Sequence, residues 1–246
     1  MGAPPLTVIV PVYNEARNFA RWHAEAAPYL PTGAVVRIVY DRDDDDTLPV
    51  QRALAAAGAR VEALKNSGRG ARGALITGLR SATSGAVLVS MADLCDDLAV
   101  LPCMLAAHHA GASVVVASRY MPGGRQVGGP WLKGQLSRWG GRSLHWLAGF
   151  PVHDATNSFR LYDVGLLRSL RLAPEGGFEI GFEITLAAWQ MGLKVVEVPC
   201  TWRDRVAGES RFALARWLPR YGRLWLSGLS HGLLRRAGLR RDDGAR

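Results

Sequence analysis

The stretch AVLVSMADLCDD, Ala86 to Asp97, is the one from which the rest of the chain is best interpreted. Val87 to Val89 form an apolar, β-branched run that predicts a buried strand. Three acids, Asp93, Asp96 and Asp97, follow as the apolar run stops. In an open α/β sheet, ligands bind beyond the carboxyl ends of the strands, where carboxylates can hold a hard divalent cation against phosphates. The alternative is that these acids cap the next helix; it suits Asp97 best and Asp93 least.

Strand-like runs alternate with helix-like segments of about ten residues through the first half of the chain. The expected strands are 7–12, 35–40, 60–64, 87–89 and 113–118, and the expected helices between them include 16–29, 48–57 and 71–82. This alternation predicts an α/β fold with a mostly parallel sheet and helices on both faces.

Length and composition narrow the class of protein. A chain of 246 residues with 48% hydrophobic residues indicates one large globular domain with appendages. No apolar run approaches the roughly 20 residues that span a bilayer, and the N-terminus lacks the basic segment of a signal peptide. Cys95, Cys103 and Cys200 lack metal-ligand spacing, which favours reduced thiols in a cytosolic protein.

The formal net charge is +9, and residues 201–246 contain eleven arginines against four acids. Such a tail suits nucleic acid, an anionic membrane surface or solubility. Nucleic acid is disfavoured, because the acids cluster where the ligands of this fold bind. Residues 212–234 place arginines opposite Trp and Leu on a helical wheel, which fits either an in-plane membrane helix or a helix packed on the domain. The same two interpretations hold for Trp131, Trp139 and Trp146.

Acids also follow the second expected strand, at Asp41 and 43–46. They are either a solvated loop whose last member, Asp46 or Thr47, caps a helix, or a cluster that needs a cation or hydrogen-bond donors beside it. Asp41 is nearest the strand end and is the member expected to face a ligand.

The segment GRGARG, 68–73, matches G-x-G-x-x-G between a strand and a helix, and Asp93 follows twenty residues later. Taken alone, this is a dinucleotide fingerprint with its ribose-binding acid, and it favours an NAD-dependent oxidoreductase. Against it, the motif follows the third strand and carries two arginines. The alternative interpretation is that these glycines serve a tight turn and close helix packing.

Several long motifs in a fixed order resemble family-2 glycosyltransferases of the GT-A fold, in the branch of dolichol- or polyprenol-phosphate sugar transferases. They are VIVPVYNE (8–15), GRGARGALITGLRSATSG (68–85), MADLCDD (91–97), SRYMPGG (118–124), DATNSFRLY (154–162), FEIGFEITLAAWQMGLKVVEVP (178–199) and RVAGESRF (205–212). The resemblance implies a GT-A nucleotide-diphospho-sugar transferase domain at 1–211 and a basic, amphipathic helical tail at 212–246. It also assigns GRGARG to the turn before a GT-A helix.

The resemblance also implies roles for individual residues. The expected donor-binding residues are Pro11, Tyr13, Glu15, Asp41, Gly70, Arg119 and Arg138. The expected acceptor-binding residues are Asn157, Ser158, Arg205 and Arg211. The expected catalytic residues are Asp93, Asp154, Arg119 and Arg205, with Asp93 and Asp96 as ligands of Mg²⁺ or Mn²⁺.

The chain departs from the metal-binding D-x-D motif of this family. Met91 stands at the first Asp, and Cys95 at the position often held by Gln. Neither is a good oxygen ligand for Mg²⁺ or Mn²⁺. We therefore expect Asp93 to bind the metal with water, phosphate oxygens and a neighbouring acid.

The expected reaction is inverting transfer from a nucleotide-diphosphate sugar to a polyprenyl phosphate or a related glycan or lipid acceptor. A phosphate acceptor needs no strong base, whereas a hydroxyl acceptor does, and Asp154 is the first candidate for that base. The expected location is cytoplasmic, peripheral on the inner face of the membrane through the C-terminal tail.

Overall fold

The computed structural model describes residues 5–204 and 214–239. Its strands are β1 (Leu6–Pro11), β2 (Val35–Tyr40), β3 (Val61–Lys65), β4 (Ala86–Val89), β5 (Val114–Ser118), β6 (Arg125–Val127), β7 (Arg160–Asp163), β8 (Val195–Pro199) and β9 (Thr201–Arg203). Its helices are α1 (Ala16–Ala26), α2 (Thr47–Ala56), α3 (Gly70–Ser81), α4 (Leu101–His109), α5 (Trp131–Ala148), α6 (Val164–Ser169), α7 (Ile180–Gln190) and α8 (Leu214–Arg236), with short 3-10 helices η1 (Ala27–Tyr29) and η2 (Leu98–Val100).

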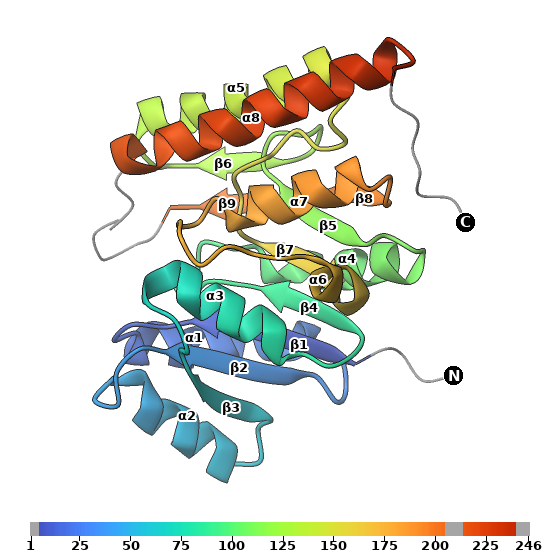
Figure 1. The fold of residues 1–246 in the computed structure, drawn as a ribbon. Helices are drawn as coiled ribbons and strands as arrows, with labels where there is room; N and C mark the ends of the chain where they lie inside the picture. Colours follow the sequence, from blue (N-terminus) through green and yellow to red (C-terminus); the bar gives the residue numbers. More distant parts are fainter. Residues whose placement is uncertain (1–4, 205–213, 240–246) are drawn as a thin grey trace.

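Seven strands form one sheet in the order β3-β2-β1-β4-β7-β5-β8 (Figure 1). Every neighbouring pair is parallel except the two pairs made by β7, which runs antiparallel to β4 and β5. The prediction of an α/β fold with a mostly parallel sheet is confirmed. β6 and β9 pair separately as a parallel two-stranded ribbon.

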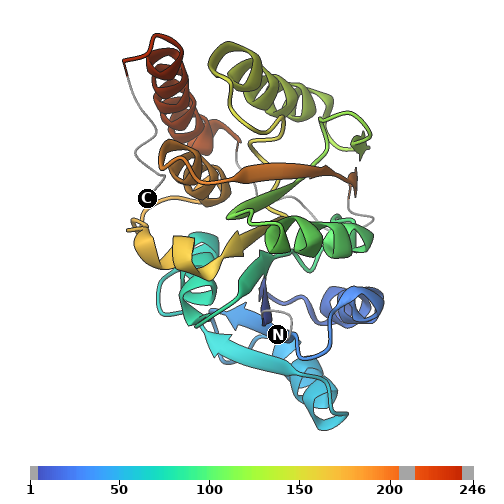
Figure 2. The same cartoon turned by 90° about the vertical axis from the view of Figure 1, so that its right-hand side faces the viewer.

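Helices cover both faces of the sheet, as the view in Figure 2 shows. Helices α3, α6 and α7 pack on one face, and α1, α2 and α4 contribute to the core on the other. Strand β1 serves both cores, because Ile9 faces the first and its neighbours Val8 and Val10 face the second. This burial on both sides explains why the strand is a continuous apolar run without alternation.

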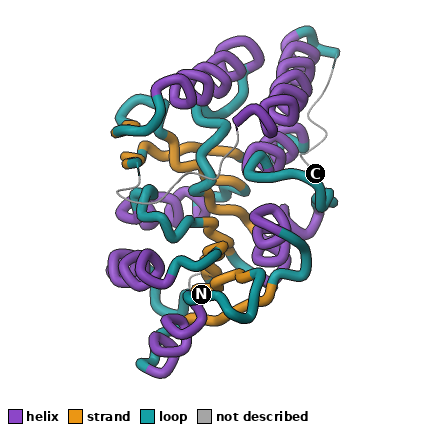
Figure 3. Tube along the Cα trace, turned by 90° about the vertical axis from the view of Figure 1, so that its left-hand side faces the viewer, coloured by secondary structure: helices purple, strands orange, loops and turns teal. Residues whose placement is uncertain are grey.

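Helices α5 and α8 lie side by side beyond the β8 end of the sheet (Figures 1 and 3). They run in the same direction. Trp225 Nε1 donates to Ser143 Oγ, Gly228 packs against Leu144, and Gly232 packs against Ala148. α8 therefore packs onto the rest of the molecule through one face. The division into a domain at 1–211 and a tail at 212–246 stays a prediction.

Pro219 lies inside α8 near its start. Among the residues that the structure describes, no helix combines the length and hydropathy needed to cross a bilayer.

Candidate active site

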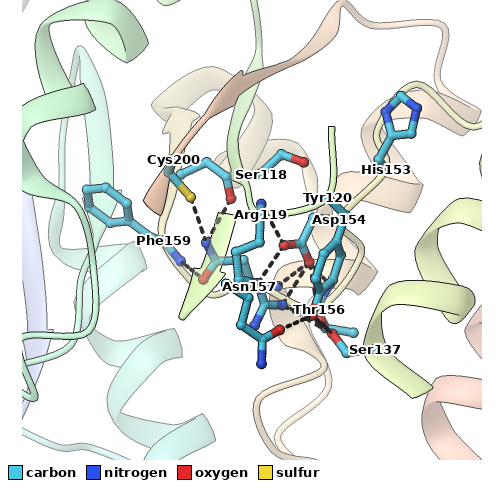
Figure 4. A network of polar contacts seen from close by, with 12 residues as sticks. Ser118, Arg119, Tyr120, Ser137, His153, Asp154, Thr156, Asn157, Phe159 and Cys200 are labelled. Carbon is cyan, nitrogen blue, oxygen red and sulfur yellow. Dashed lines mark hydrogen bonds and ion pairs between the residues drawn. The ribbon is translucent and has the colours of Figure 1, made fainter. Parts of the chain in front are cut away.

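Arg119 and Asp154 form a buried ion pair at the end of β5 (Figure 4). Arg119 Nε lies 2.7 Å from Asp154 Oδ2, and its Nη2 lies 3.0 Å from Oδ1, so the contact is bidentate. The Arg119 backbone N–H also donates to Oδ2, at 3.1 Å. Bidentate arginine–carboxylate contacts fix orientation as well as adding energy.

Asp154 is fully buried, and its carboxylate is saturated with hydrogen-bond donors. Besides Arg119, the backbone N–H groups of Thr156 and Asn157 donate to Oδ1, at 3.1 and 3.0 Å. Burial by itself would raise the pKa of Asp154, but the Arg119 guanidinium and these donors outweigh it and hold the pKa below its usual value. The immediate role of Asp154 is therefore to hold Arg119.

The remaining surroundings of Arg119 come from three other elements. Nη2 donates to Thr156 Oγ1 at 2.7 Å and to Ser137 Oγ, on α5, at 3.2 Å. The guanidinium lies over the Tyr120 ring, 4.7 Å from its centroid, and 5.8 Å from that of Trp202 on β9. β5, α5, the 154–157 loop and β9 all contribute contacts to this side chain. Arg119 is therefore a rigidly placed cation beyond the carboxyl end of β5.

Asn157 and Ser158, which are predicted to bind the acceptor, lie in the same loop. Asn157 is buried, and its Nδ2 donates to Ala117 O at 2.7 Å, which ties the loop to β5. Ser158 is partly exposed. The next strand contains the fully buried Arg160, whose Nε donates to Asn157 O at 2.7 Å. Sequence reasoning missed Arg160, although a cation inside the strand-like end of DATNSFRLY was the available signal.

After β4, the segment that carries the three acids turns back toward the end of the strand. Leu94 adopts a left-handed conformation (φ 61°), which turns the chain sharply between Asp93 and Asp96. Asp96 Oδ2 accepts from Ser90 Oγ at 3.1 Å and from Met91 N at 3.2 Å. Burial and the nearby charge of Asp93 raise the pKa of Asp96 to about 7.

Asp93 and Asp96 thus form a pair of mutually repelling carboxylates, while the side chain of Met91 packs on the core. Among the described residues, no group of three or more His, Cys, Asp or Glu side chains could hold a metal ion. Mg²⁺ commonly takes one or two carboxylates and completes its shell with water and substrate phosphates. The pair has the donor chemistry that such a cation takes, and its assignment as the metal site stays a prediction.

Capping does not explain Asp96 and Asp97. Neither side chain caps the following helices, η2 and α4. Asp97 Oδ2 instead accepts from Thr201 N on β9, at 3.2 Å. Asp96 binds the residues that follow β4, and Asp97 binds β9.

Asp96 and Asp97 lie close to the ion pair of Arg119 and Asp154, because all four act on the same thiol. Burial raises the pKa of the Cys200 thiol to about 12, and the carboxylates of Asp154, Asp96 and Asp97 act in the same direction, against the opposing effect of Arg119. The structure therefore brings Asp93, Asp96, Arg119 and Asp154 together at one edge.

The residues after β1 and β2 form a second part of the same edge. Pro11 ends β1, Tyr13 is exposed, and Glu15 is partly buried, with its Oε2 accepting from Asn18 Nδ2 at 2.7 Å. Asp41 follows β2 and accepts from Asn66 Nδ2 at 2.5 Å. Because β1, β2 and β4 are parallel neighbours, their carboxyl ends meet here.

The acid run at 41–46 mostly binds donors of the protein itself. Asp45 accepts from Asn14 N, and Asp46 accepts from Ala16 N, each at 3.0 Å. Asp46 occupies the N-cap position of α2 but makes no side-chain cap there. The prediction that these acids need hydrogen-bond donors is confirmed. Asp46 is the N-cap residue of α2, one of the two residues predicted there, but its carboxylate makes no capping hydrogen bond because it accepts from the start of α1.

The glycine turn, residues 68–73, joins β3 to α3. A Cβ on Gly68 would lie 3.0 Å from Gly73 Cα, so the two backbones touch and neither position has room for a side chain. Asn66 connects this turn to Asp41, since its Nδ2 also reaches Gly70 O at 3.3 Å and its Oδ1 accepts from Gly68 N at 2.8 Å. β3 is an edge strand, whereas a dinucleotide turn follows a central strand at the switch point.

Arg138 lies on α5, 5.4 Å from the centroid of the Tyr120 ring, and its buried Nε has no hydrogen-bond partner within the described ranges. It flanks the Arg119 cluster. Arg205 and Arg211 lie outside the described residues.

Residues 7–171 match the family model described as Glycosyl transferase family 2. The chain belongs to this family. This family-2 glycosyltransferase is 32% identical over 219 residues to the polyprenol monophosphomannose synthase of Mycolicibacterium smegmatis, covering 84% of this chain and 80% of the relative. It is 30% identical to the undecaprenyl-phosphate mannosyltransferase of Micrococcus luteus, covering 83% of this chain and 86% of the relative.

The solved structures of similar fold include glucosyl-3-phosphoglycerate synthase from Mycobacterium tuberculosis in complex with Mn²⁺, UDP-glucose and phosphoglyceric acid. The match has a TM-score of 0.64 and 18% identity and covers 92% of this chain and 79% of the other. This likeness supports the GT-A fold. The oxidoreductase alternative is wrong, since the family and the edge position of the glycine turn both contradict it.

Proposed function

We propose that this glycosyltransferase moves a hexosyl group from a nucleotide-diphosphate sugar to a polyprenyl phosphate, with inversion at the anomeric carbon. The names of its two relatives at 30% and 32% identity support a polyprenyl phosphate acceptor. In the structure, one observation carries the proposal: Asp154 is buried and bound to Arg119. Asp154 therefore fixes an arginine in the site and is not free to act as a general base.

An acceptor hydroxyl must lose a proton as it attacks, so it needs a base within hydrogen-bond reach. Asp154 is fully buried, its oxygens are occupied by Arg119 and backbone donors, and its pKa is lowered, so it is a poor base. A polyprenyl phosphate is ionised already at neutral pH and needs only a cation to position it. Arg119 supplies a cation whose orientation is set before the substrate binds.

The proposed step balances without a proton. One oxygen of the acceptor phosphate forms a bond to the anomeric carbon, and the bond from that carbon to the donor diphosphate breaks. The electron pair leaves with the nucleoside diphosphate, and attack from the opposite side inverts the anomeric centre. Arginine donors, Arg119 and Arg138 among them, stabilise the charge that develops on the leaving oxygen.

A divalent cation held by Asp93 and Asp96 would supply further charge neutralisation at the diphosphate. Ser90 Oγ and the Met91 N–H fix the Asp96 carboxylate from the protein side. On the donor side, Asp41 and Asn66 line the ends of β2 and β3, as expected for residues near a base or ribose.

Helices α5 and α8 are proposed to place the site on a membrane. Apolar side chains stand exposed along both of them, with Trp131 the most exposed at 75%. The others are Leu132, Leu136, Trp139, Trp146 and Leu147 on α5, and Leu218, Leu226, Leu233 and Leu234 on α8. Arg223, Arg235 and Arg236 add positive charge to the same pair of helices. Exposed Trp and Leu with basic neighbours are typical of a helix lying in a membrane interface.

The packing interpretation of α8 also holds in part. Tyr221, Leu224, Trp225 and Leu229 pack against the core, while other leucines of the helix stay exposed. One face therefore joins the domain and another is left for the proposed membrane contact. Since a polyprenyl phosphate presents its head group at the bilayer surface, we propose a peripheral location, at the cytoplasmic face.

Transfer of label from UDP- and GDP-sugars to a polyprenyl phosphate in detergent, with and without EDTA, tests the proposal. A lipid-linked, chelator-sensitive product is expected. Lipid product that survives EDTA would refute the metal part of the proposal. Nucleotide-sugar turnover without lipid product would move the acceptor to a saccharide hydroxyl.

A further inference from the structure

A cluster of buried charges lies outside the residues assigned so far. Arg72, on the first turn of α3, is 3% exposed, and its Nη2 donates to Glu183 Oε2 at 2.7 Å. Glu179, just before α7, is 4% exposed and lies 3.9 Å from Arg72 Nη1. Arg220, on α8, approaches Glu179 from the other side, with Nη1 at 3.3 Å from Oε1. A single carboxylate thus faces two arginines from two different helices.

The backbone is shaped to hold this cluster. Gly177 N donates to both oxygens of Glu179, at 2.9 and 3.0 Å. At Gly176, which has φ +139°, a Cβ would lie 2.4 Å from Glu179 Oε1, 2.6 Å from Arg220 Nη1 and 2.8 Å from Arg72 Cδ. The three charged side chains therefore converge on a position that only glycine can occupy.

The cluster connects two regions with different proposed roles. Arg72 belongs to the turn 68–73, whose Gly70 carbonyl is bound by Asn66, and Asn66 in turn binds Asp41 on the donor side. Arg220 belongs to α8, one of the two helices proposed to contact the membrane. In Figure 1, α3 and α8 both begin on the same, left-hand side of the molecule. A path of polar contacts, in which the backbone of residues 70–72 is one link, therefore runs from α8 to the donor-side edge.

One contact in this path is incomplete. Arg72 Nη1 is buried and has no hydrogen-bond partner within the described residues, since Glu179 stands 3.9 Å away. The Arg220 side chain is 39% exposed, and its Nη1 lies 3.3 Å from Glu179 Oε1. Any ligand that fixes α8 against the core reduces the conformational freedom of Arg220, and through Glu179 that of Arg72.

We propose that Glu179 is a positioning residue that couples α8 to the donor side, so that seating of α8 on an anionic membrane strengthens nucleotide-sugar binding. This inference rests on the proposed function. Coupling of this kind is reciprocal, so bound nucleotide sugar also strengthens membrane binding by the same factor.

The test measures the affinity of the full chain for UDP-glucose and for GDP-mannose by calorimetry, with and without vesicles of phosphatidylglycerol and phosphatidylcholine. The variants are Arg220→Gln, which breaks the contact to Glu179, and Arg223→Gln as the matched control. Arg223 is exposed on the same helix and carries the same charge, so each variant removes one positive charge from α8. Urea unfolding of both variants checks that each substitution leaves the fold intact.

For the wild type and Arg223→Gln, vesicles are expected to raise nucleotide-sugar affinity by about five-fold or more, the lower range of measured couplings. For Arg220→Gln, the affinities with and without vesicles are expected to be equal, while vesicle binding matches that of the control. Equal coupling in the two variants, or none in the wild type, would overturn the inference while the proposed function stands. A wild type that binds neither nucleotide sugar would overturn both.

Discussion

At the scale of single residues, Arg119 and Asp154 tie the site to the stability of the fold, because neither charge can be removed alone without leaving the other buried. Replacing one partner of a buried ion pair typically costs about 3–5 kcal/mol, whereas apolar replacement of both is often close to neutral. We expect Asp154→Leu and Arg119→Met each to lower the free energy of unfolding by about that amount. The double variant should recover most of it, as measured by urea unfolding. Strictly additive losses would mean that the pair does not interact.

The same pair gives a pH dependence of defined sign. The pKa of Asp154 is lowered in the folded protein, so its stabilising contribution is full above the unfolded value and is lost as pH falls through the folded value. Wild type should therefore lose more stability than Asp154→Asn between about pH 5 and pH 3, where carboxylates of ordinary pKa titrate. Unfolding curves at each pH measure the difference, and parallel pH profiles would contradict the assignment.

Asp93 and Asp96 carry the prediction about the metal. Asp93→Asn and Asp96→Asn should each weaken Mn²⁺ binding in the presence of UDP or GDP by about ten-fold or more, since even outer-shell partners have effects of that size. Asp43→Asn is the control, because Asp43 is exposed and pairs with Lys65 on the surface. Spin resonance of free Mn²⁺ measures binding without turnover. Unchanged affinity in both variants would place the metal elsewhere.

At the scale of elements, helix α3 depends on a glycine where it crosses β1. A Cβ on Gly78 would lie 2.3 Å from Ile9 Cγ2, so Gly78→Ala should destabilise the protein by about 1–3 kcal/mol through overpacking. Gly140, inside α5, has nothing within 4 Å of the same position. There, alanine should add about 0.5–1 kcal/mol, because it removes the entropic cost of a helical glycine. Urea midpoints of both variants test the packing, and equal shifts would contradict it.

The pair α5–α8 carries the membrane prediction. Trp139 and Trp146 are 54% and 55% exposed and pack edge to face, with ring centroids 6.0 Å apart. Replacing both with alanine should weaken binding to anionic vesicles by about ten-fold or more, from the apolar area no longer buried. Tyr29→Ala, an exposed aromatic outside this pair of helices, is the control for general stickiness. Sedimentation with vesicles gives the partition coefficients, and equal values for the two proteins would refute the docking surface.

At the scale of the whole molecule, the sequence was sufficient for the alternation of strands and helices, because strands buried on both faces are continuous apolar runs. It was not sufficient for strand order. Nothing local in RLYD, 160–163, marks β7 as the antiparallel strand between β4 and β5, since that position depends on the path of the chain through 131–159.

The candidate site, too, could be predicted only in part from the sequence. Motifs located Arg119, Asp93 and Asp154, but the burial of Asp154 and its pairing with Arg119 join residues 35 positions apart. The cluster of Arg72, Glu179 and Arg220 spans still more of the chain. Glu179 and Glu183 are one helical turn apart, and both carboxylates face Arg72.

The central claim is that the acceptor is a phosphate and needs no base from the protein. The most direct measurement compares undecaprenyl phosphate with undecaprenol as acceptor under the same conditions, with a labelled nucleotide sugar that supports turnover. The account predicts a glycosyl phosphate product from the first and none from the second. Sugar transferred to the alcohol, or to a saccharide hydroxyl in preference to the lipid phosphate, would contradict it.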